Sequence, residues 1–216
     1  MKLENKAVLI AGASSETGRA LAKAFEKEGA RIAAVSSDKA GLESLKAFLE
    51  NAETIYADPS STGSIDAAVD LALKNLGSID ILVNIPEIAD SNAPIAELTD
   101  EDFDRAMKAC LKAPTAYMRK TLNYFLKNER PGNIINIACA DLTGGTAVSA
   151  FNAALISLTK NTTFMYMPNK IRCNIIDDRG TIEETTSAAL YLASDESSYI
   201  NGVTFPTDGS WTLCSR

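Results

Sequence analysis

The sequence predicts an α/β protein built on one doubly wound parallel sheet of about seven strands, with helices on both faces. Short runs of apolar and β-branched residues alternate with amphipathic helical patterns from one end of the chain to the other. Continuous apolar strands are typical of parallel sheets that are buried on both faces. The 216 residues carry no internal repeat and no composition break, so we expect a single domain over 1–216.

The predicted elements alternate strictly. We expect strands at 6–12, 31–37, 54–58, 80–84, 133–138, 171–176 and 202–206. Helical periodicity covers 18–29, 39–51, 64–77, 100–128, 147–167 and 183–194. Pro114 should kink the helix that contains it, because proline cannot donate a backbone hydrogen bond. Ligands bind such sheets at the carboxyl ends of the strands, so we look for functional residues in the loops there.

Composition and charge argue against several classes of function. A net charge of −7 disfavours nucleic acid and anionic membrane surfaces as partners. No apolar run reaches transmembrane length, and residues 1–10 carry charges where a signal peptide would be apolar, so we expect a cytoplasmic protein. The four cysteines form no C-x-x-C pair and histidine is absent. We therefore expect reduced thiols and no metal site.

An ordered series of motifs runs along nearly the whole chain. "AGASSETG" (11–18) follows the first strand, where glycines allow a backbone to approach a pyrophosphate at a helix N-terminus. The later members are "DILVN" (80–84), "GNIINIA" (132–138), "NAALISLTK" (152–160), "IRCN" (171–174) and "LASDESSYINGVTFPTDGSW" (192–211). In this order they resemble the short-chain dehydrogenase/reductase family, which has a Rossmann-type fold and binds NAD or NADP.

The resemblance implies a set of dinucleotide-binding residues, with Asp58 on the adenine side. Members that prefer NAD carry an acid near Ser36, and members that prefer NADP carry a base near Ser37. Neither is present, so the choice between the two cofactors stays open. Lys39 could reach the 2′-phosphate of NADP, but a lysine in the first turn of a helix is more often simply solvated. The implied set comprises Gly12, Ser14, Ser15, Gly18, Ser36, Ser37, Asp58 and Asn84.

Two acids intrude on this implied site, and weak or absent cofactor binding is an equally good alternative. Glu16 replaces the middle glycine of the loop, and Glu87 replaces the glycine of the family's N-N-A-G turn. Two like charges ~4 Å apart near a surface repel by about 4 kcal/mol. We hypothesise that Glu16 partly obstructs the pyrophosphate position and that Glu87 lies beside the nicotinamide ribose. A first-turn acid such as Glu16 also gains about 0.3–1 kcal/mol from the helix dipole.

The catalytic residues of the family have no chemical counterparts in this chain. A Tyr and a Lys four residues apart share one helix face, where the ammonium lowers the tyrosine pKa. The resemblance aligns Val148 with the Tyr and Asn152 with the Lys. It aligns Cys110 with the catalytic Asn, and Cys139, or less well Ala138, with the Ser.

Two further segments bear on catalysis. Tyr166 and Lys170 satisfy Y-x-x-x-K, but Pro168 breaks the helix between them and a strand follows at once, so we expect no catalytic role. The connection "DDRGTIEE" after the sixth strand leaves only about six residues before the next helix, too few for the family's substrate lid. Thr181 in this segment resembles the family's carboxamide-contacting threonine.

We therefore expect a protein of this family without standard dehydrogenase activity: a non-catalytic subunit, a scaffold, or a nucleotide- or ligand-binding protein. The alternative is an NAD(P)-dependent oxidoreductase with non-standard catalytic residues, in which Cys139 or Cys110 has a thiol role. The resemblance also implies a homo-oligomer, a dimer or tetramer, that pairs through helices 100–128 and 147–167. Pairing with an active relative is a further expectation.

Overall fold

The computed structural model describes residues 1–87, 93–138 and 145–209. These residues form a seven-stranded sheet in which every neighbouring pair is parallel, in the order β3-β2-β1-β4-β5-β6-β7. The doubly wound α/β sheet expected from the sequence is confirmed. The strands are β1 (Ala7–Ala11), β2 (Arg31–Ser36), β3 (Ala52–Tyr56), β4 (Ile81–Asn84), β5 (Gly132–Ala138), β6 (Ile171–Asp177) and β7 (Thr204–Pro206).

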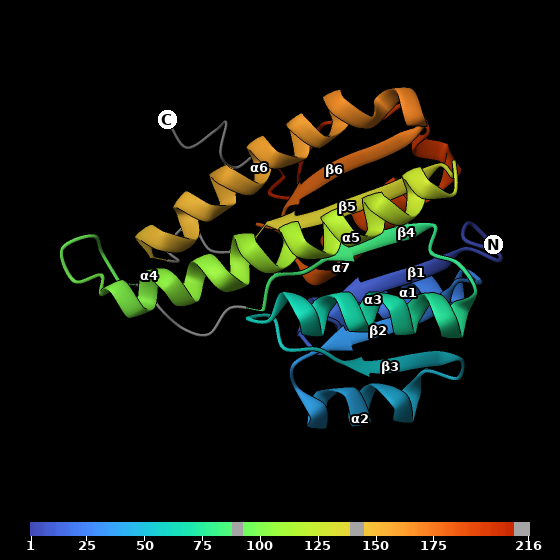
Figure 1. Ribbon diagram of the computed structural model, residues 1–216, viewed down its shortest axis with the longest axis horizontal. Coiled ribbons are helices and arrows are strands. Elements are labelled where there is room, and N and C mark those ends of the chain that lie inside the picture. The colour runs from blue at the N-terminus through green and yellow to red at the C-terminus, as the bar shows by residue number, and fades with distance from the viewer. Residues whose placement is uncertain (88–92, 139–144, 210–216) are drawn as a thin grey trace.

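Helices cover both faces of the sheet (Figure 1). On one face lie α1 (Glu16–Lys27), α2 (Lys39–Phe48) and α7 (Ile182–Ala193), whose buried side chains form one core cluster with the strands. On the other face lie α3 (Thr62–Leu76), α5 (Ala113–Lys127) and α6 (Thr146–Tyr166). The helix α4 (Asp100–Met107) extends with the start of α6 beyond the end of the sheet, as Figure 1 shows.

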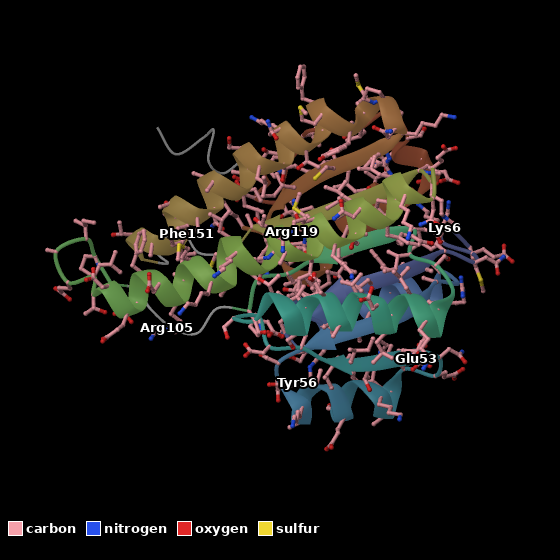
Figure 2. The ribbon with its side chains drawn as sticks, in the orientation of Figure 1. Lys6, Glu53, Tyr56, Arg105, Arg119 and Phe151 are labelled. Carbon is pink, nitrogen blue, oxygen red and sulfur yellow. The ribbon has the colours of Figure 1, made fainter. Side chains whose placement is uncertain are left out.

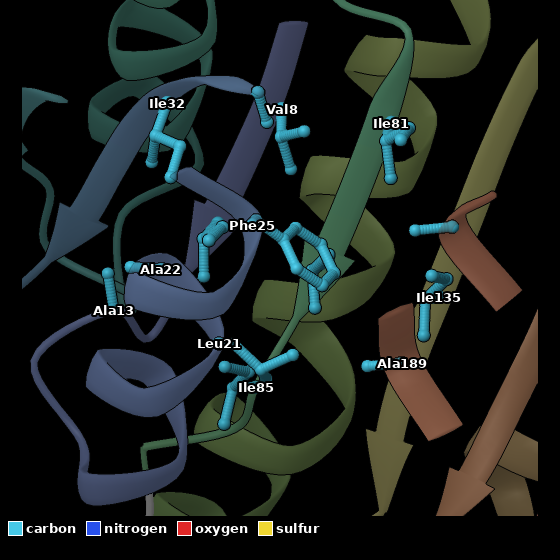
Figure 3. Close-up of a cluster of buried hydrophobic side chains, with 14 of the residues drawn as sticks. Val8, Ala13, Leu21, Ala22, Phe25, Ile32, Ile81, Ile85, Ile135 and Ala189 are labelled. Atoms are coloured by element: carbon cyan, nitrogen blue, oxygen red, sulfur yellow. The ribbon is translucent and has the colours of Figure 1, made fainter. Parts of the chain in front are cut away.

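The core on the α1 face is centred on the ring of Phe25, which is fully buried between α1 and the sheet (Figure 3). Leu21 and Ala22 come from the same helix, and Val8, Ile81 and Ile135 come from three different strands. On α1, Phe25 lies three residues after Ala22 and four after Leu21, the spacing that puts side chains on one buried helix face. The packing fixes α1, and with it the glycine-rich loop that precedes it.

The strand order reverses next to β1. The chain passes from β1 outward through β2 and β3, then returns to place β4 on the other side of β1. Ala11, the last residue of β1, is in register with Val35 and with Asn84. The loops after β1, β2 and β4 therefore meet at one point on the carboxyl edge, where open α/β sheets bind ligands.

The long helix around Pro114 is interrupted, although not by a simple kink. The segment Lys108–Lys112 is a π-helix, and the N–H of Ala113 bonds to the carbonyl oxygen of Lys108, five residues earlier. Pro114 follows at the start of α5 and has no N–H for the carbonyl of Cys110, four residues before it. The wider π-helical turn accommodates the missing N–H of Pro114. The interruption of the helix therefore lies in the turn that precedes the proline.

Some predicted boundaries were wrong by two residues. Helix α1 begins at Glu16 rather than 18, because the Ser15 hydroxyl accepts a hydrogen bond from the N–H of Gly18 and caps the first turn. Strand β3 begins at Ala52 rather than 54, because Ala52 and Glu53 pair with β2 despite their low β-propensity. Both differences arise from contacts that single-residue propensities do not contain.

Within the described ranges, no helix combines the length and apolar character needed to cross a membrane. The same residues contain no cluster of three or more His, Cys, Asp or Glu side chains placed to hold a metal ion.

A buried polar chain ties β4, β5 and α6 together. The Asn84 amide donates to Asn136 Oδ1 at 2.8 Å, and the Asn136 amide donates to Thr159 Oγ1 at 2.9 Å. All three side chains are buried. A buried donor that loses its partner costs about 1–3 kcal/mol, so Asn136 has two neighbours that depend on it.

We expect Asn136→Ala to lower the free energy of unfolding by about 2–5 kcal/mol, because it strands the Asn84 amide and the Thr159 hydroxyl and leaves a cavity. Thr159→Val, which removes a single partner, should cost about 1–2 kcal/mol. Urea unfolding followed by circular dichroism measures both. Equal losses in the two variants would contradict a central role for Asn136.

Candidate functional site

The carboxyl edge of the sheet holds a small cavity of about 30 Å³, room for one or two water molecules. The loops after β1, β2 and β4 supply Gly12, Ser37 and Glu87 to its lining, and α5 closes it with Tyr117. Figure 2 shows Tyr56 and Arg105 toward this edge of the sheet, with Lys6 at the opposite edge. The cavity therefore lies at the strand-order reversal beside β1.

The two glycines of the loop after β1 are required by close backbone approaches. Gly12 has φ +82°, and a Cβ there would lie 2.0 Å from the carbonyl oxygen of Ile85. A Cβ on Gly18 would lie 2.4 Å from the carbonyl oxygen of Gly12. Ser15 bridges the loop and the helix, since its hydroxyl donates to the Gly12 oxygen at 2.8 Å and accepts from the Gly18 N–H at 3.1 Å. The N-terminus of α1 is thus presented to the loop, as in anion sites.

Glu16 is the first residue of α1 and its side chain is exposed. It therefore stands at the N-terminal end of the helix beside the glycine loop. The obstruction of a pyrophosphate by Glu16 stays a prediction.

The Glu87 carboxylate reaches Ser14 in the loop after β1 and the two serines at the end of β2. Its predicted place beside a nicotinamide ribose stays a prediction. Glu87 Oε2 accepts from the Ser37 hydroxyl at 2.9 Å, while Oε1 accepts from the hydroxyls of Ser36 and, at 3.3 Å, Ser14. The Ser14 and Ser36 hydroxyls are themselves 2.6 Å apart. The sequence revealed the acid but not its partners, because these depend on the path of the loop that follows β4.

Asp58 and Lys39 lie near this edge with other partners. The Asp58 carboxylate accepts from the Ser60 hydroxyl at 2.7 Å and from the Ser60 N–H at 2.8 Å. Both hydrogen bonds lower the pKa of Asp58, and the bond from the Ser60 hydroxyl has the larger effect. The Lys39 ammonium lies 4.9 Å from the centre of the Tyr56 ring, a cation–π contact. Neither side chain lines the cavity.

Asn84 and Tyr117 supply the polar groups at the floor of the cavity. Asn84 Oδ1 is buried and has no hydrogen-bond partner among the described residues. Burial raises the pKa of the Tyr117 hydroxyl above its ordinary value, and the charge of Glu87 adds to the effect. The sequence analysis did not predict Tyr117 as a lining residue. Its spacing of four residues from Ala113 puts both on one face of α5, and both line the cavity.

The start of α6 forms an apolar corner with the π-helix. Val148 and Cys110, which the resemblance aligns with the family's Tyr and Asn, are buried in one cluster that also contains Phe151. The Phe151 ring packs on Phe103 with centroids 5.0 Å apart. Asn152 lies half-buried on the next turn. The predicted serine equivalent Cys139 lies outside the described residues, and the less favoured Ala138 is buried at the end of β5.

Other candidates from the sequence have structural partners or lie at the wrong edge. Thr181 caps α7 in a reciprocal pair with Glu184, whose carboxylate accepts from the Thr181 N–H at 2.7 Å. Helix α6 ends at Tyr166, and Lys170 immediately precedes β6, at the amino edge of the sheet. Burial raises the pKa of the Cys173 thiol to about 12, so that cysteine is not a nucleophile at neutral pH.

A family model for short chain dehydrogenase matches residues 6–189, which is most of the chain. The chain belongs to the short-chain dehydrogenase family. The resemblance inferred from the motifs is thereby confirmed, and the oxidoreductase alternative is supported better than the non-catalytic expectation.

Individual relatives agree with this family. The chain is 32% identical to 3beta-hydroxysteroid dehydrogenase 2 of Eggerthella lenta, over 97% of this chain and 96% of that protein. It is 34% identical to galactitol 2-dehydrogenase of Agrobacterium fabrum, over 82% of this chain and 70% of the relative. Among solved structures, 3-ketoacyl-(acyl-carrier-protein) reductase of Brucella melitensis complexed with NADH superposes with a TM-score of 0.89 at 28% identity, covering 96% and 98% of the two chains.

Levodione reductase superposes with a TM-score of 0.91 at 23% identity, covering 98% of this chain and 99% of its own. At that identity the likeness shows the fold alone.

Asp178, at the carboxyl end of β6, is a buried carboxyl whose pKa is raised by burial, even though the Thr185 hydroxyl donates to it. A raised folded-state pKa means that ionisation of this acid destabilises the folded protein. The effect sets in as the pH rises through the ordinary carboxyl range, about 4, and persists above the folded-state pKa.

We expect Asp178→Asn to increase the free energy of unfolding at pH 7, above the ordinary carboxyl pKa, and to give no such gain at about pH 3. Urea unfolding at both pH values tests this, with the exposed Glu50→Gln as the charge control. A gain of the same size at both pH values would show that ionisation of Asp178 is not the cause.

Proposed function

We propose that this chain is an NAD(P)-dependent oxidoreductase of the short-chain type that works with non-standard catalytic residues. The observation that carries the proposal is the similarity to proteins named as dehydrogenases, at 32% identity over nearly the full length of one and at 34% over 82% of this chain for another. A member of that group, in complex with NADH, has the same fold. When bound, the dinucleotide supplies the hydride chemistry.

The residues after β1 fit the phosphate end of a dinucleotide. Gly12 and Gly18 keep that surface free of side chains, since a Cβ on either would collide with backbone. Ser15 fixes the α1 N-terminus, whose dipole favours an anion. On the adenosine side, Ser36 and Ser37 line the cavity, and Ser37 is the exposed residue whose hydroxyl is available to a ribose.

The proton step is where this chain departs from its family. Val148 has no proton to give, and no described tyrosine lies four residues before a lysine within α6. General acid–base assistance is worth about 10²–10⁴ in rate, so we place turnover lower by that factor than in relatives with the Tyr–Lys pair. The connection from β6 to α7 consists of residues 178–181 only, which favours an open site in which water exchanges the proton.

A second candidate function is a nucleotide-binding subunit or scaffold without turnover. Its specific support is the apolar cluster of Val148, Cys110 and Phe151, which replaces polar catalytic groups with packing. In either case we propose a cytoplasmic homo-oligomer that pairs through helices 100–128 and 147–167. Pairing with an active relative is the corresponding proposal for the scaffold.

Calorimetric titration with NAD, NADH, NADP and NADPH, followed by an absorbance assay on secondary alcohols and ketones, separates these functions. We expect binding of at least one dinucleotide and slow turnover. If a dinucleotide binds but no alcohol or ketone of the panel is converted, the second candidate is favoured. No binding at millimolar cofactor would contradict both the oxidoreductase and the nucleotide-binding subunit, and would leave only the scaffold.

Glu16→Gly should strengthen dinucleotide binding by about tenfold or more, because it removes a like charge and a side chain from the phosphate position. Glu16→Gln, which keeps the bulk, should recover part of that gain. Calorimetry measures both variants against wild type. Unchanged affinity in the pair would refute obstruction by Glu16.

A further inference from the structure

One carboxylate joins three loops at the functional edge. Glu87 follows β4, yet its two oxygens accept hydrogen bonds from Ser14 in the loop after β1 and from Ser36 and Ser37 at the end of β2. Ser37 also directs its N–H toward Glu87 Oε2, at 3.4 Å. A carboxylate at the end of β2 is the group that hydrogen-bonds the ribose hydroxyls of NAD in dinucleotide-binding folds. This chain has serines there, and Glu87 brings a carboxylate to the same place from the neighbouring loop.

The surroundings of Glu87 have the size of a nucleoside site. On one side the carboxylate borders the small cavity over Gly12 and Asn84. On the other it borders a groove of about 530 Å³ that runs past Ser37, Pro59 and Ala109. Small-molecule sites occupy about 300–1,000 Å³, so the groove is large enough for an adenosine whose ribose faces Glu87.

We propose that Glu87 makes this protein select NAD over NADP, by accepting hydrogen bonds from the vicinal hydroxyls of the adenosine ribose and repelling a 2′-phosphate. The inference rests on the proposed function and names the cofactor of the same site. A carboxylate has about four acceptor positions, and the serine hydroxyls rotate freely. A ribose diol replaces serine donors on Glu87 without leaving its charge unsatisfied.

The charges around the serines favour the same choice. Asp38 lies beside Ser14, since a Cβ on Gly41 would be within 2.5 Å of both the Asp38 carboxylate and the Ser14 Cβ. Arg19 is held by the Ser14 carbonyl at 2.8 Å and by Ser44. A 2′-phosphate here would therefore meet the carboxylates of Glu87 and Asp38.

Three other basic side chains lie nearby. Lys39 packs over Tyr56. Arg105 and Lys108 line the far side of the groove, where Arg105 pairs with Asp102 and where Glu101 and Asp104 also lie. The positive charges of Arg105 and Lys108 are thus balanced by acids in the same groove. The carboxylates of Glu87 and Asp38, next to the serines, are therefore the charges that disfavour a 2′-phosphate.

The test is calorimetric titration of wild type, Glu87→Gln and Glu87→Ala with NAD and with NADP. The matched control is Glu50→Gln, an exposed acid in the turn before β3 at the amino edge of the sheet. We expect wild type to bind NAD at least about tenfold more tightly than NADP. Glu87→Gln should weaken NAD binding by about tenfold and narrow or reverse the preference, whereas the control should keep both affinities.

Two results would overturn the inference while leaving the proposed function intact. Tighter NAD binding in Glu87→Gln and Glu87→Ala would mean that the carboxylate blocks the ribose position. An NAD-to-NADP ratio unchanged by either substitution would mean that Glu87 takes no part in the choice. Failure of wild type and every variant to bind either cofactor would remove the proposed function and this inference together. Circular dichroism spectra and melting temperatures matching wild type establish that the variants are folded.

Discussion

A contact between two backbones holds the functional edge in place: Gly12, with φ +82°, lies against the carbonyl of Ile85. Any side chain at Gly12 would force the loops after β1 and β4 apart. Ala11, one residue earlier, pairs with both β2 and β4, so the contact falls at the strand-order reversal. The turn after β4 is thereby set over the end of β2, which brings Glu87 to the serines. The asparagine chain beneath, from Asn84 to Asn136, fixes the floor of the same region.

The two ends of this edge differ in polarity. At the phosphate end, the glycines and the Ser15 cap preserve a surface suited to an anion. At the other end, Val148 and Cys110, which the resemblance aligns with catalytic residues, are part of a packed apolar cluster. The family comparison supports an oxidoreductase better than a non-catalytic protein.

The fold followed from the sequence because alternating apolar strands and amphipathic helices leave few arrangements other than a doubly wound sheet. Gly12 and Gly18 were also predictable, since their spacing after a strand implies a close backbone approach. The position of Glu87 was not, because it depends on how the β4 loop crosses β2. Likewise, Pro114 predicted an interruption, but the π-turn ahead of it reflects how the neighbouring carbonyls adjust. Local patterns therefore predicted the fold and the close backbone approach at Gly12, whereas tertiary contacts determine the partners of Glu87.

We propose that the carboxyl edge beside β1 receives a dinucleotide. A crystal structure of the protein grown with NAD is the decisive measurement. We expect the pyrophosphate against Gly12 and the α1 N-terminus, with the adenosine ribose within hydrogen-bonding distance of Glu87. Well-diffracting crystals grown at millimolar NAD that show no nucleotide at this edge, or show it bound elsewhere, would contradict this proposal.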